Sequence, residues 1–494
     1  MTQPAVRSAS GAIWVDVTGR DRVRHLALLA VALTAALVYV NALANGFVLD
    51  DGGVVRANPL VTSAASAWRS FALPYWPEAI GGGQYRPLGI ISFAIDWRIS
   101  GGDPRWFHAV NVLWHVAATV GVWLLAAELL SPVGALAAGL GFAVHPVHVE
   151  AVANVVGRLE CMAAVFVLGA LLAHRRGHRS APVWFALGLL SKESGIVLIG
   201  LTLANDALLT QDWRAAFRAR RWWYASYAVV TLVYAATLVA IFHDRALSNP
   251  ARVFAGATVP ERIALVAQVI PHYVRLLLAP AHLSASYAPN VITPFTGFTT
   301  SAALGAMLTV VLATAFLAAV HGRRWPVLAF AMIWVPIALA PVSNLLFPSG
   351  VLLAERTLYL PSVGVCLAAG AVAERLLAVR PAVRLAAAAV VVGFAARTWT
   401  RTPVWRDDQT YLLTLLADHP ESYEAHLTAG RVLKGAGRLD EGARELSIAR
   451  QLFPRDPLVY REAADLALRQ QRPGVAAALL DSARFAPTLP VSTR

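Results

Sequence analysis

The chain has 494 residues, of which 57% are hydrophobic and only 14% are charged, and its mean hydropathy is +0.57. A soluble globular domain carries about 25% charged residues, so this composition excludes an ordinary soluble protein and indicates an integral membrane protein. The net charge of +13 does not indicate a nucleic-acid partner, because Lys and Arg collect in the cytoplasmic loops of membrane proteins. Cys161 and Cys366 both lie in apolar segments, which excludes a disulfide framework and a cysteine-based metal site.

The N-terminus predicts a first transmembrane helix and not a cleavable signal. Arg20, Arg22 and Arg24 precede a long apolar run, and no small-residue cleavage site in a polar context follows it. Residues 1–25 are therefore expected in the cytoplasm. We expect a transmembrane catalytic domain over 26–398 and a helical domain over 399–494.

Apolar runs predict an all-α, polytopic bundle of about eleven crossings. They lie near 26–44, 109–128, 133–147, 160–174, 181–191, 194–209, 222–242, 300–320, 325–342, 358–378 and 382–396. Basic clusters at 175–179, 214–221, 321–324 and 380–384 are expected on the cytoplasmic side. Segment 262–280, which contains Pro271 and Pro280, then cannot be a simple crossing and is expected to be re-entrant, interfacial or a packed loop.

This topology gathers the polar loops on one side of the membrane. They are 45–107, 145–159, about 243–299 and 343–357, and together they form the extracytoplasmic face. Polar side chains that converge on one face are what a binding or catalytic site requires.

The first of these loops contains Asp50 and Asp51 directly after the first helix. Carboxylates at a membrane edge are unfavourable, which favours a functional interpretation. One Asp would accept a proton from an acceptor hydroxyl, while the other orients it or binds a cation. The alternative is a solvated helix end followed by a Gly-Gly turn.

The same loop continues with Gly81 to Gly83 and then Tyr85-Arg86-Pro87. Arg86 could bind a phosphate through two parallel hydrogen bonds, or it could pair with Asp50 or Asp51. Beyond it, His108, Asn111 and His115 share one helix face. A metal site is one interpretation of this face, but no further acids stand in register for zinc, and polar packing within the bundle is favoured. Tyr85, His108 and Asn111 are also candidates for binding the donor phosphate or the substrate.

Three later segments add further candidates. The stretch 145–160 is too dense in polar residues for packing alone. The motif "SKES" predicts an internal ion pair between Lys192 and Glu193. In "LAERTLYLPSVG", the guanidinium of Arg356 would suit a lipid phosphate at the membrane boundary. The candidates are His145, His148, Glu150, Asn154, Arg158, Glu160, Lys192, Glu193, Glu355, Arg356 and Tyr359.

After Trp399 the composition becomes that of a soluble segment. An offset of 34 residues pairs Leu446 with Leu480 and Ala449 with Ala483, as in tetratricopeptide (TPR) repeats. About two units are present, so they would pack on the helix near 406–418 or on a partner. A generic helical hairpin is the alternative.

Taken in order, DD after the first helix, YRPL, HxxN, HPVHVEAVANVVGR, SKES, AERTLYLPS and the C-terminal repeats resemble the TMTC-type O-mannosyltransferases, from about Asn45 onwards. The resemblance implies the GT-C superfamily, and a bacterial member in the inner membrane with its site loops and repeats outside. It also implies inverting transfer of mannose or a similar sugar from a polyprenyl-phosphate donor to a protein or glycan hydroxyl.

Within that resemblance, Asp50 is the first choice for the general base and Asp51 the second. Arg86, Arg158 or Arg356 would stabilise the departing lipid phosphate. The lipid tail would lie in a groove between helices, and the repeats would capture the acceptor. A divalent cation is left open as a cofactor, and no nucleic acid is expected.

Two other classes of protein compete with this interpretation. Intramembrane charges also occur in transporters and flippases, but an inverted internal repeat is not evident here. A membrane scaffold in which only the repeats act is the third class, and it would be insensitive to substitution of the loop acids.

Overall fold

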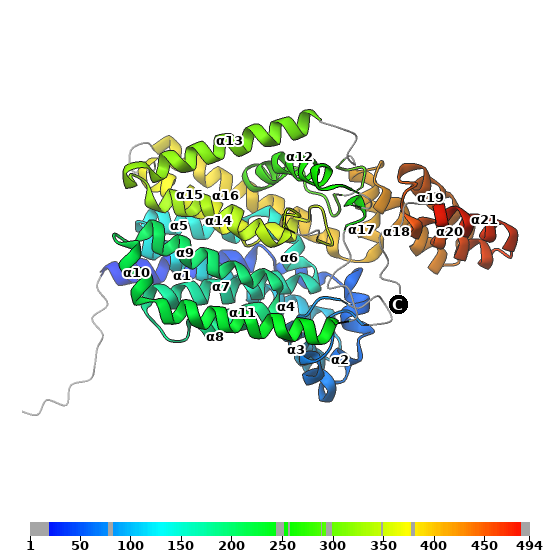
Figure 1. The fold of residues 1–494 in the computed structure, drawn as a ribbon, viewed down its shortest axis with the longest axis horizontal. Helices are drawn as coiled ribbons and strands as arrows, with labels where there is room; N and C mark the ends of the chain where they lie inside the picture. The colour runs from blue at the N-terminus through cyan, green and yellow to red at the C-terminus, as the bar shows by residue number, and fades with distance from the viewer. Residues whose placement is uncertain are drawn as a thin grey trace, which may run out of the picture.

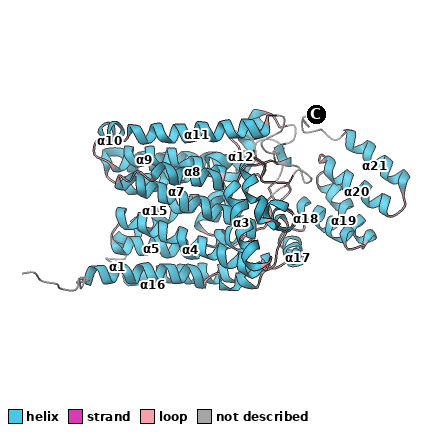
Figure 2. Ribbon diagram, turned by 90° about the horizontal axis from the view of Figure 1, so that it is seen from below, coloured by secondary structure: helices cyan, strands magenta, loops and turns pink. Residues whose placement is uncertain are grey.

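The computed structural model describes residues 19–77, 83–243, 251–254, 257–287, 289–292, 299–346, 349–376 and 381–485. All regular secondary structure in these ranges is helical (Figures 1 and 2). The all-α prediction is therefore confirmed. Gly81 and Gly82 of the predicted first-loop turn lie outside the described residues, as does most of segment 1–25.

A bundle of roughly parallel and antiparallel helices forms the body of the molecule (Figure 1). Each predicted crossing contains one of these helices. They are α1 (Gly19–Leu37), α4 (Pro104–Leu129), α5 (Pro132–Val144), α7 (Arg158–Arg176), α8 (Ala181–Ser191), α9 (Leu198–Leu209), α11 (Arg221–Phe242), α13 (Thr300–Val320), α14 (Pro326–Leu339), α15 (Pro361–Leu376) and α16 (Pro381–Arg401).

Six helices among the described residues are long and apolar enough to cross a membrane. A seventh results if α5 and the segment Pro146–Ala153, bent by 45° against it, form one span. The apolar helices Ala181–Ser191 and Pro326–Val342 are shorter. The protein is thus a multi-pass membrane protein, and the number of eleven crossings stays a prediction.

Helix α12 (Val259–Leu278) contains Pro271 and is amphipathic, with its apolar side buried. Helix α13 ends beside the end of α9, because Arg323 donates hydrogen bonds to the carbonyls of Ala207 and Thr210. Helix α11 begins at this same end of the bundle, because the short helix α10 (Trp213–Ala219) joins the end of α9 to the start of α11. If α11 and α13 each cross once, α12 makes no net crossing. This agrees with the expectation for segment 262–280.

Small residues let the bundle helices approach closely, as membrane interiors require. Helices α5 and α15 meet at Gly134 and Gly370. A Cβ atom on Gly134 would lie 2.9 Å from the Gly370 carbonyl oxygen, and one on Gly370 would lie 2.5 Å from the Gly134 oxygen. No larger residue fits at either position without separating the two helices.

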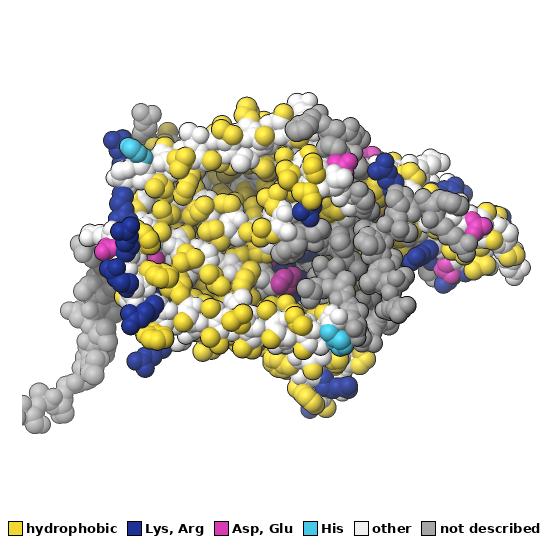
Figure 3. Space-filling view, in the orientation of Figure 1, with side chains coloured by type: hydrophobic (Ala, Val, Ile, Leu, Met, Phe, Trp, Pro, Cys, Tyr) yellow, Lys and Arg dark blue, Asp and Glu magenta, His cyan; other side chains and the backbone are white. Residues whose placement is uncertain are grey.

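The two ends of the bundle differ in charge. Lys and Arg side chains line the end that holds α10, while the flank between the ends is largely apolar (Figure 3). The acid Glu128 at this basic end accepts hydrogen bonds from Arg175 at 2.8 Å and Arg176 at 2.7 Å. The C-terminal helices lie beyond the opposite end (Figure 1).

Short helices and loops cover that opposite end. They are η1 (Val40–Ala44), η2 (Gly52–Arg56), α2 (Pro59–Thr62), η3 (Ala64–Phe71), α3 (Pro87–Ser100), η5 (Pro146–His148), α6 (Val149–Ala153), η6 (Val155–Gly157), η7 (Glu193–Val197), η8 (Arg252–Phe254) and η11 (Glu355–Leu358). Proline at the first turn begins α2, α3 and η5, where its missing N–H is not needed.

The C-terminal part begins with η12 (Thr402–Trp405) and α17 (Asp408–Asp418). Two helical hairpins follow, α18 (Tyr423–Gly435) with α19 (Leu439–Leu452) and α20 (Pro457–Arg469) with α21 (Pro473–Phe485). Gly430 of α18 packs against Leu446 of α19, where a Cβ atom would lie 2.5 Å from the leucine side chain. Paired helices agree with the 34-residue offset, and the TPR assignment stays a prediction.

Candidate functional site

Charged side chains from four separate segments meet at the end of the bundle opposite the basic clusters. The first loop contributes Asp50 and Arg86, α6 contributes Glu150, the α8–η7 turn contributes Glu193, and η11 contributes Arg356. We call these five residues the charged site. The site therefore depends on how the bundle folds and not on any one sequence motif.

Asp50 and Asp51 have different surroundings. Asp51 is fully buried, and its carboxylate accepts hydrogen bonds from the backbone N–H groups of Val48 and Val156, both at 2.9 Å. Burial raises the pKa of Asp51 to about 7, while the two backbone hydrogen bonds lower it. Asp51 thus joins the first loop to the start of α7.

The carboxylate of Asp50 makes no hydrogen bond to any residue that the structure describes, and the residue is half-buried. Burial raises its pKa above the usual range. The charges of Arg356 and Arg86 lower the pKa of Asp50, and the charge of Glu150 raises it. Asp50 is consequently a half-buried carboxylate that is close enough to two guanidinium groups for their charges to affect its pKa.

Glu150 holds Arg356 by two contacts. Its carboxylate accepts the backbone N–H of Arg356 at 2.8 Å and also pairs with the guanidinium. The negative charge of Glu150 raises the pKa of Arg356 well above its usual range, and the charge of Asp50 adds to this effect. Burial alone would lower the pKa of Arg356. The Arg356 side chain is 29% exposed, so part of the guanidinium stays open to a ligand.

Arg86 pairs with Glu193, and neither Asp50 nor Asp51 is its hydrogen-bond partner. The guanidinium donates two hydrogen bonds to the Glu193 carboxylate, at 2.9 and 2.5 Å, and it also lies 5.2 Å from the ring centre of Tyr75. The Glu193 side chain is 42% exposed. An exposed carboxylate is the weaker partner here, because water competes for it.

The internal ion pair expected within "SKES" is not formed. Lys192 pairs with Glu160 on α7, while Glu193 turns to Arg86. Both Lys192 and Glu160 are buried. Each of the two consecutive charges in this turn therefore has a different partner, and the turn links α7 to the first loop.

The structure corrects the role predicted for Arg158. This residue is fully buried, pairs with Asp96, and donates to Asn111 Oδ1 at 2.6 Å, Ser92 Oγ at 2.8 Å and the Phe107 carbonyl at 2.8 Å. Each guanidinium nitrogen already has an acceptor inside the protein, and the fully buried side chain is not open to a lipid phosphate. Arg158 joins α3, α4 and α7 inside the protein.

The polar face of α4 is buried, which fits packing within the bundle and not the predicted binding of donor or substrate by His108 and Asn111. Asn111 donates to the carbonyl of Asn154 at 2.9 Å, and His108 hydrogen-bonds to the carbonyl of Gly46 at 3.0 Å. Both side chains are fully buried. The structure does not bring them to the charged site.

A second buried group consists of three histidines and Tyr359. His115 hydrogen-bonds to the Tyr359 hydroxyl at 2.8 Å, His148 to Ser362 Oγ at 2.7 Å, and His145 to a carbonyl at the end of α12 at 3.0 Å. All of these side chains are buried. They connect α4, α5, α12 and α15 below the charged site.

Glu355 is next to Arg356 in the chain but faces the other way. Its Oε1 accepts hydrogen bonds from the Ser284 N–H and the Tyr287 hydroxyl, both at 2.6 Å. Burial raises the pKa of Glu355 to about 7. Tyr85, from the YRPL motif, donates to the Phe71 carbonyl at 3.0 Å. Both residues hold loops around the charged site.

Sequence reasoning missed Tyr75, whose ring lies beside Arg86. Tyr75 is buried, and its hydroxyl has no hydrogen-bond partner among the described residues. Its backbone N–H donates to the Gln84 carbonyl at 2.8 Å, which brings the two arms of the first loop together. The aromatic pair Tyr75-Trp76 within the polar loop was the signal that could have found it.

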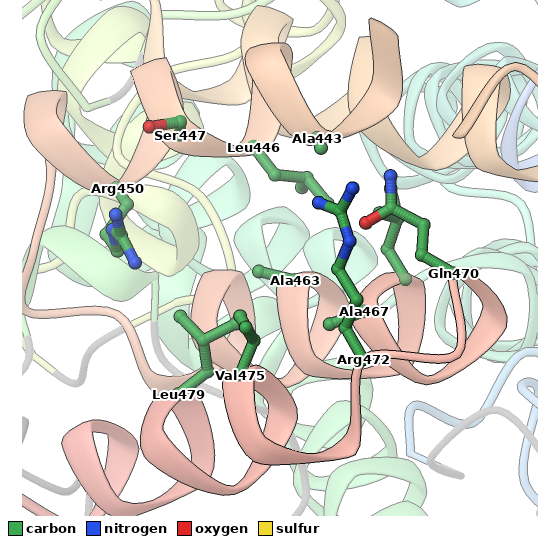
Figure 4. A pocket seen from close by; sticks show the side chains of 11 residues that line it. Ala443, Leu446, Ser447, Arg450, Ala463, Ala467, Gln470, Arg472, Val475 and Leu479 are labelled. Carbon is green, nitrogen blue, oxygen red and sulfur yellow. The ribbon is translucent and has the colours of Figure 1, made fainter. Parts of the chain in front are cut away.

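Two hollows lie outside the charged site. One, of about 410 Å³, is lined by Gly52, Arg56, Ala57 and Trp97 beside the first loop. The other, of about 170 Å³, lies between α19, α20 and α21, where Leu446 and Leu479 form apolar walls and Arg450 and Arg472 are basic (Figure 4). Among the described residues, no group of three or more His, Cys, Asp or Glu could hold a metal ion.

The sequence of this chain is similar to those of known protein mannosyltransferases. Residues 93–241 match the family described as dolichyl-phosphate-mannose-protein mannosyltransferase. The chain is similar to protein O-mannosyl-transferase F38B6.6 of Caenorhabditis elegans, with 24% identity over 86% of this chain and 63% of the relative. Human protein O-mannosyl-transferase TMTC3 is 23% identical over 87% of this chain and 55% of the relative.

A shorter and stronger similarity links the chain to protein O-mannosyl-transferase Tmtc2 of Drosophila melanogaster, with 39% identity over 35% of this chain and 21% of the relative. The chain spans 63% of the worm relative and 55% of the human one. No solved structure matches the chain significantly.

The fold and site define an all-helical, multi-pass membrane protein with a charged site at one end of its bundle. The matched family and the named relatives are protein mannosyltransferases, so the resemblance to the TMTC-type O-mannosyltransferases that the motifs predicted is confirmed as a similarity.

Proposed function

We propose that this protein is an integral-membrane glycosyltransferase that moves mannose or a similar sugar from a polyprenyl-phosphate donor to a hydroxyl of a protein or glycan. The observation that carries the proposal is the contrast between the two first-loop acids. Asp51 accepts hydrogen bonds from two backbone N–H groups, whereas Asp50 has no hydrogen bond to a described residue and lies within the influence of the Arg356 and Arg86 charges. The names of the relatives support the sugar and the acceptor class.

In the proposed reaction Asp50 is the general base. The acceptor oxygen attacks the anomeric carbon, its proton passes to the Asp50 carboxylate, and the bond from the anomeric carbon to the phosphate oxygen breaks. The lipid phosphate departs with that electron pair. One direct displacement inverts the anomeric carbon. Burial raises the pKa of Asp50, which makes its carboxylate a stronger base than an exposed aspartate.

The guanidinium groups of Arg356 and Arg86 would receive the phosphate. Both are tied to acids without a ligand, Arg356 to Glu150 and Arg86 to Glu193. A phosphate oxygen can replace a carboxylate as the acceptor for such a fork, so donor binding would exchange these partners. Glu193 is the more exposed of the two acids and would be displaced more easily.

We further propose that the charged site and the C-terminal helices face the outside of a bacterial inner membrane. The concentration of Lys and Arg at the opposite end supports this orientation (Figure 3). The hairpins α18–α19 and α20–α21, interpreted as TPR repeats, would then lie on the same side as the charged site, where they could capture the acceptor.

The test is sugar transfer by the purified full-length protein, supplied with a polyprenyl-phosphate-linked mannose and a peptide acceptor rich in Ser and Thr. Asp50→Asn should abolish transfer while the amount of folded protein stays normal. Retained transfer in both Asp50→Asn and Asp51→Asn would refute the assignment of the base. Substrate uptake into liposomes that is lost in Asp50→Asn, without any transfer, would instead favour a transporter.

A further inference from the structure

The first loop and the segment after α16 run side by side in the same direction. Asn41 Nδ2 donates to the Trp399 carbonyl at 2.8 Å, and Asn45 Nδ2 donates to the Thr402 carbonyl at 3.2 Å. The Gly46 N–H then donates to the next of these acceptors, the carbonyl of residue 406, at 2.7 Å. We call this row of contacts, from residues 41–49 to residues 399–408, the seam.

The seam ends one residue before Asp50. The backbone N–H of Leu49 donates to Asp408 Oδ1 at 2.8 Å. Asp408 is the first residue of α17, which leads into the C-terminal helices. The last contact of the seam is therefore the one next to the proposed base.

Leu49 has a backbone conformation that leucine rarely adopts. Its φ is +48°, in the left-handed region, where the Cβ atom crowds the backbone. Such a residue keeps this conformation only when its surroundings hold it there. Its side chain is 38% exposed, so packing of that side chain is a weak restraint. Two hydrogen bonds restrain the Leu49 backbone: its carbonyl accepts the Gly52 N–H at 3.0 Å within the loop, and its N–H donates to Asp408 from the C-terminal segment.

We infer that Asp408 is a positioning residue, which holds Leu49 in the left-handed conformation and thereby aims the Asp50 carboxylate at the acceptor. This inference rests on the proposed function, because it assigns Asp50 the role of base. It also makes the C-terminal segment part of the reaction, since an element at the beginning of α17 fixes the geometry of the catalytic loop.

The first loop and the segment after α16 approach each other closely at Gly46. A Cβ atom at this position would lie 3.2 Å from the Arg406 carbonyl oxygen. On its other side, the Gly46 carbonyl accepts the hydrogen bond from His108. The loop is thus held between α4 and the seam, and Leu49 is the point at which the chain turns from the seam into the charged site.

Asp408→Ala and Asp408→Asn form the first pair of variants. Asp408→Ala removes the acceptor and should lower kcat about tenfold with little change in the donor KM, as loss of one charge-assisted hydrogen bond implies. Asp408→Asn keeps Oδ1 as an acceptor and should retain most of kcat. A matched control is Asp407→Ala, because Asp407 caps α17 by accepting the Thr410 N–H at 2.7 Å and makes no hydrogen bond to the described residues of the first loop.

Leu49→Gly provides the rescue. Glycine adopts positive φ readily, so the loop no longer needs Asp408 to hold it. We expect the decrease in kcat caused by Asp408→Ala to be much smaller in the Leu49→Gly background than in the natural sequence. A residue with only a general structural role would give the same loss in both backgrounds.

Hydrogen exchange at the Leu49 amide supplies a readout that does not depend on sugar transfer. Exchange should accelerate in Asp408→Ala and remain slow in Asp408→Asn and Asp407→Ala. Unchanged exchange together with unchanged kcat in Asp408→Ala would overturn the inference. If the protein transfers no sugar at all, faster exchange would still support the restraint on the loop, while the proposed function would fail by itself.

Discussion

The carboxylate of Glu150 holds Arg356 at both ends, since it accepts the backbone N–H at 2.8 Å and pairs with the guanidinium. The two residues are 206 positions apart in the chain. Their contact fixes η11 against α6 and orients the guanidinium toward Asp50. Glu150 therefore acts on the proposed base in two ways, through the position of Arg356 and through its own negative charge.

Glu150→Gln should shift the acid limb of the pH–rate profile to lower pH. A general base works when deprotonated, so activity falls as the pH drops through the pKa of Asp50. The negative charge of Glu150 raises that pKa, and its removal lowers it. The measurement is kcat/KM against pH. Glu128→Gln, which changes a glutamate held by two arginines at the basic end, is the control and should leave the profile unchanged.

Asp50→Ala and Asp51→Ala should separate activity from stability. Asp51→Ala leaves the buried N–H groups of Val48 and Val156 without an acceptor, which costs about 3 kcal/mol of unfolding free energy. Asp50→Ala removes no hydrogen bond to a described residue and should unfold near the natural midpoint. Thermal unfolding in detergent measures both. Equal midpoints for the two variants would contradict this division of roles.

Arg158→Leu should destabilise the protein, whereas Arg356→Leu should mainly impair donor binding. Removal of Arg158 leaves the buried Asp96 without its cation, and breaking a buried pair costs about 3–5 kcal/mol. Arg356 is partly exposed, and its loss removes a phosphate ligand from the charged site. The yield of folded protein and the KM for the lipid donor distinguish these results. A folded Arg158→Leu with a raised donor KM would show that Arg158 also acts on the donor.

Glu355→Gln should flatten the dependence of stability on pH. The folded-state pKa of Glu355 is about 7 and its ordinary value is 4.5. Between these values the unfolded chain releases the proton while the folded protein retains it, so stability decreases as the pH rises through this window. The loss amounts to roughly 3 kcal/mol for this group.

Glutamine keeps an Oε1 that can accept from Ser284 and Tyr287, but it does not titrate. Unfolding midpoints of the natural protein and the variant should therefore diverge as the pH rises from about 4.5 to 7. Asp51 contributes a slope of the same sign in both proteins and does not affect the comparison. Parallel midpoint curves would show that Glu355 is charged in the folded state.

The helices of the bundle could be predicted because their signal is local. Hydropathy over about 20 residues identifies an apolar segment without knowledge of its neighbours. All eleven predicted segments overlap a helix, and the basic clusters alone led to the expectation that segment 262–280 makes no simple crossing. Helix bounds were less accessible, since the first apolar run was predicted near 26–44 whereas α1 spans Gly19–Leu37.

The partners within the site could not be predicted, because they depend on contacts between distant segments. Arg86 and Glu193 are 107 positions apart. Arg158 and Arg356 are both arginines in polar motifs, yet one is enclosed by acceptors and the other borders the charged site. In the same way, no local pattern distinguishes Asp50 from Asp51; the difference arises from the N–H of Val156, which the fold brings to one of them.

The seam has a consequence for the order in which the protein matures. Its hydrogen bonds connect residues that are 357 to 360 positions apart, so the loop that contains Asp50 is made early in synthesis and receives these partners only after α16 has been made. Contacts of such long sequence separation form late in folding. A nascent chain would thus carry Arg86 of the first loop before the proposed base is aligned, and premature sugar transfer during membrane insertion would be suppressed by the connectivity of the chain itself.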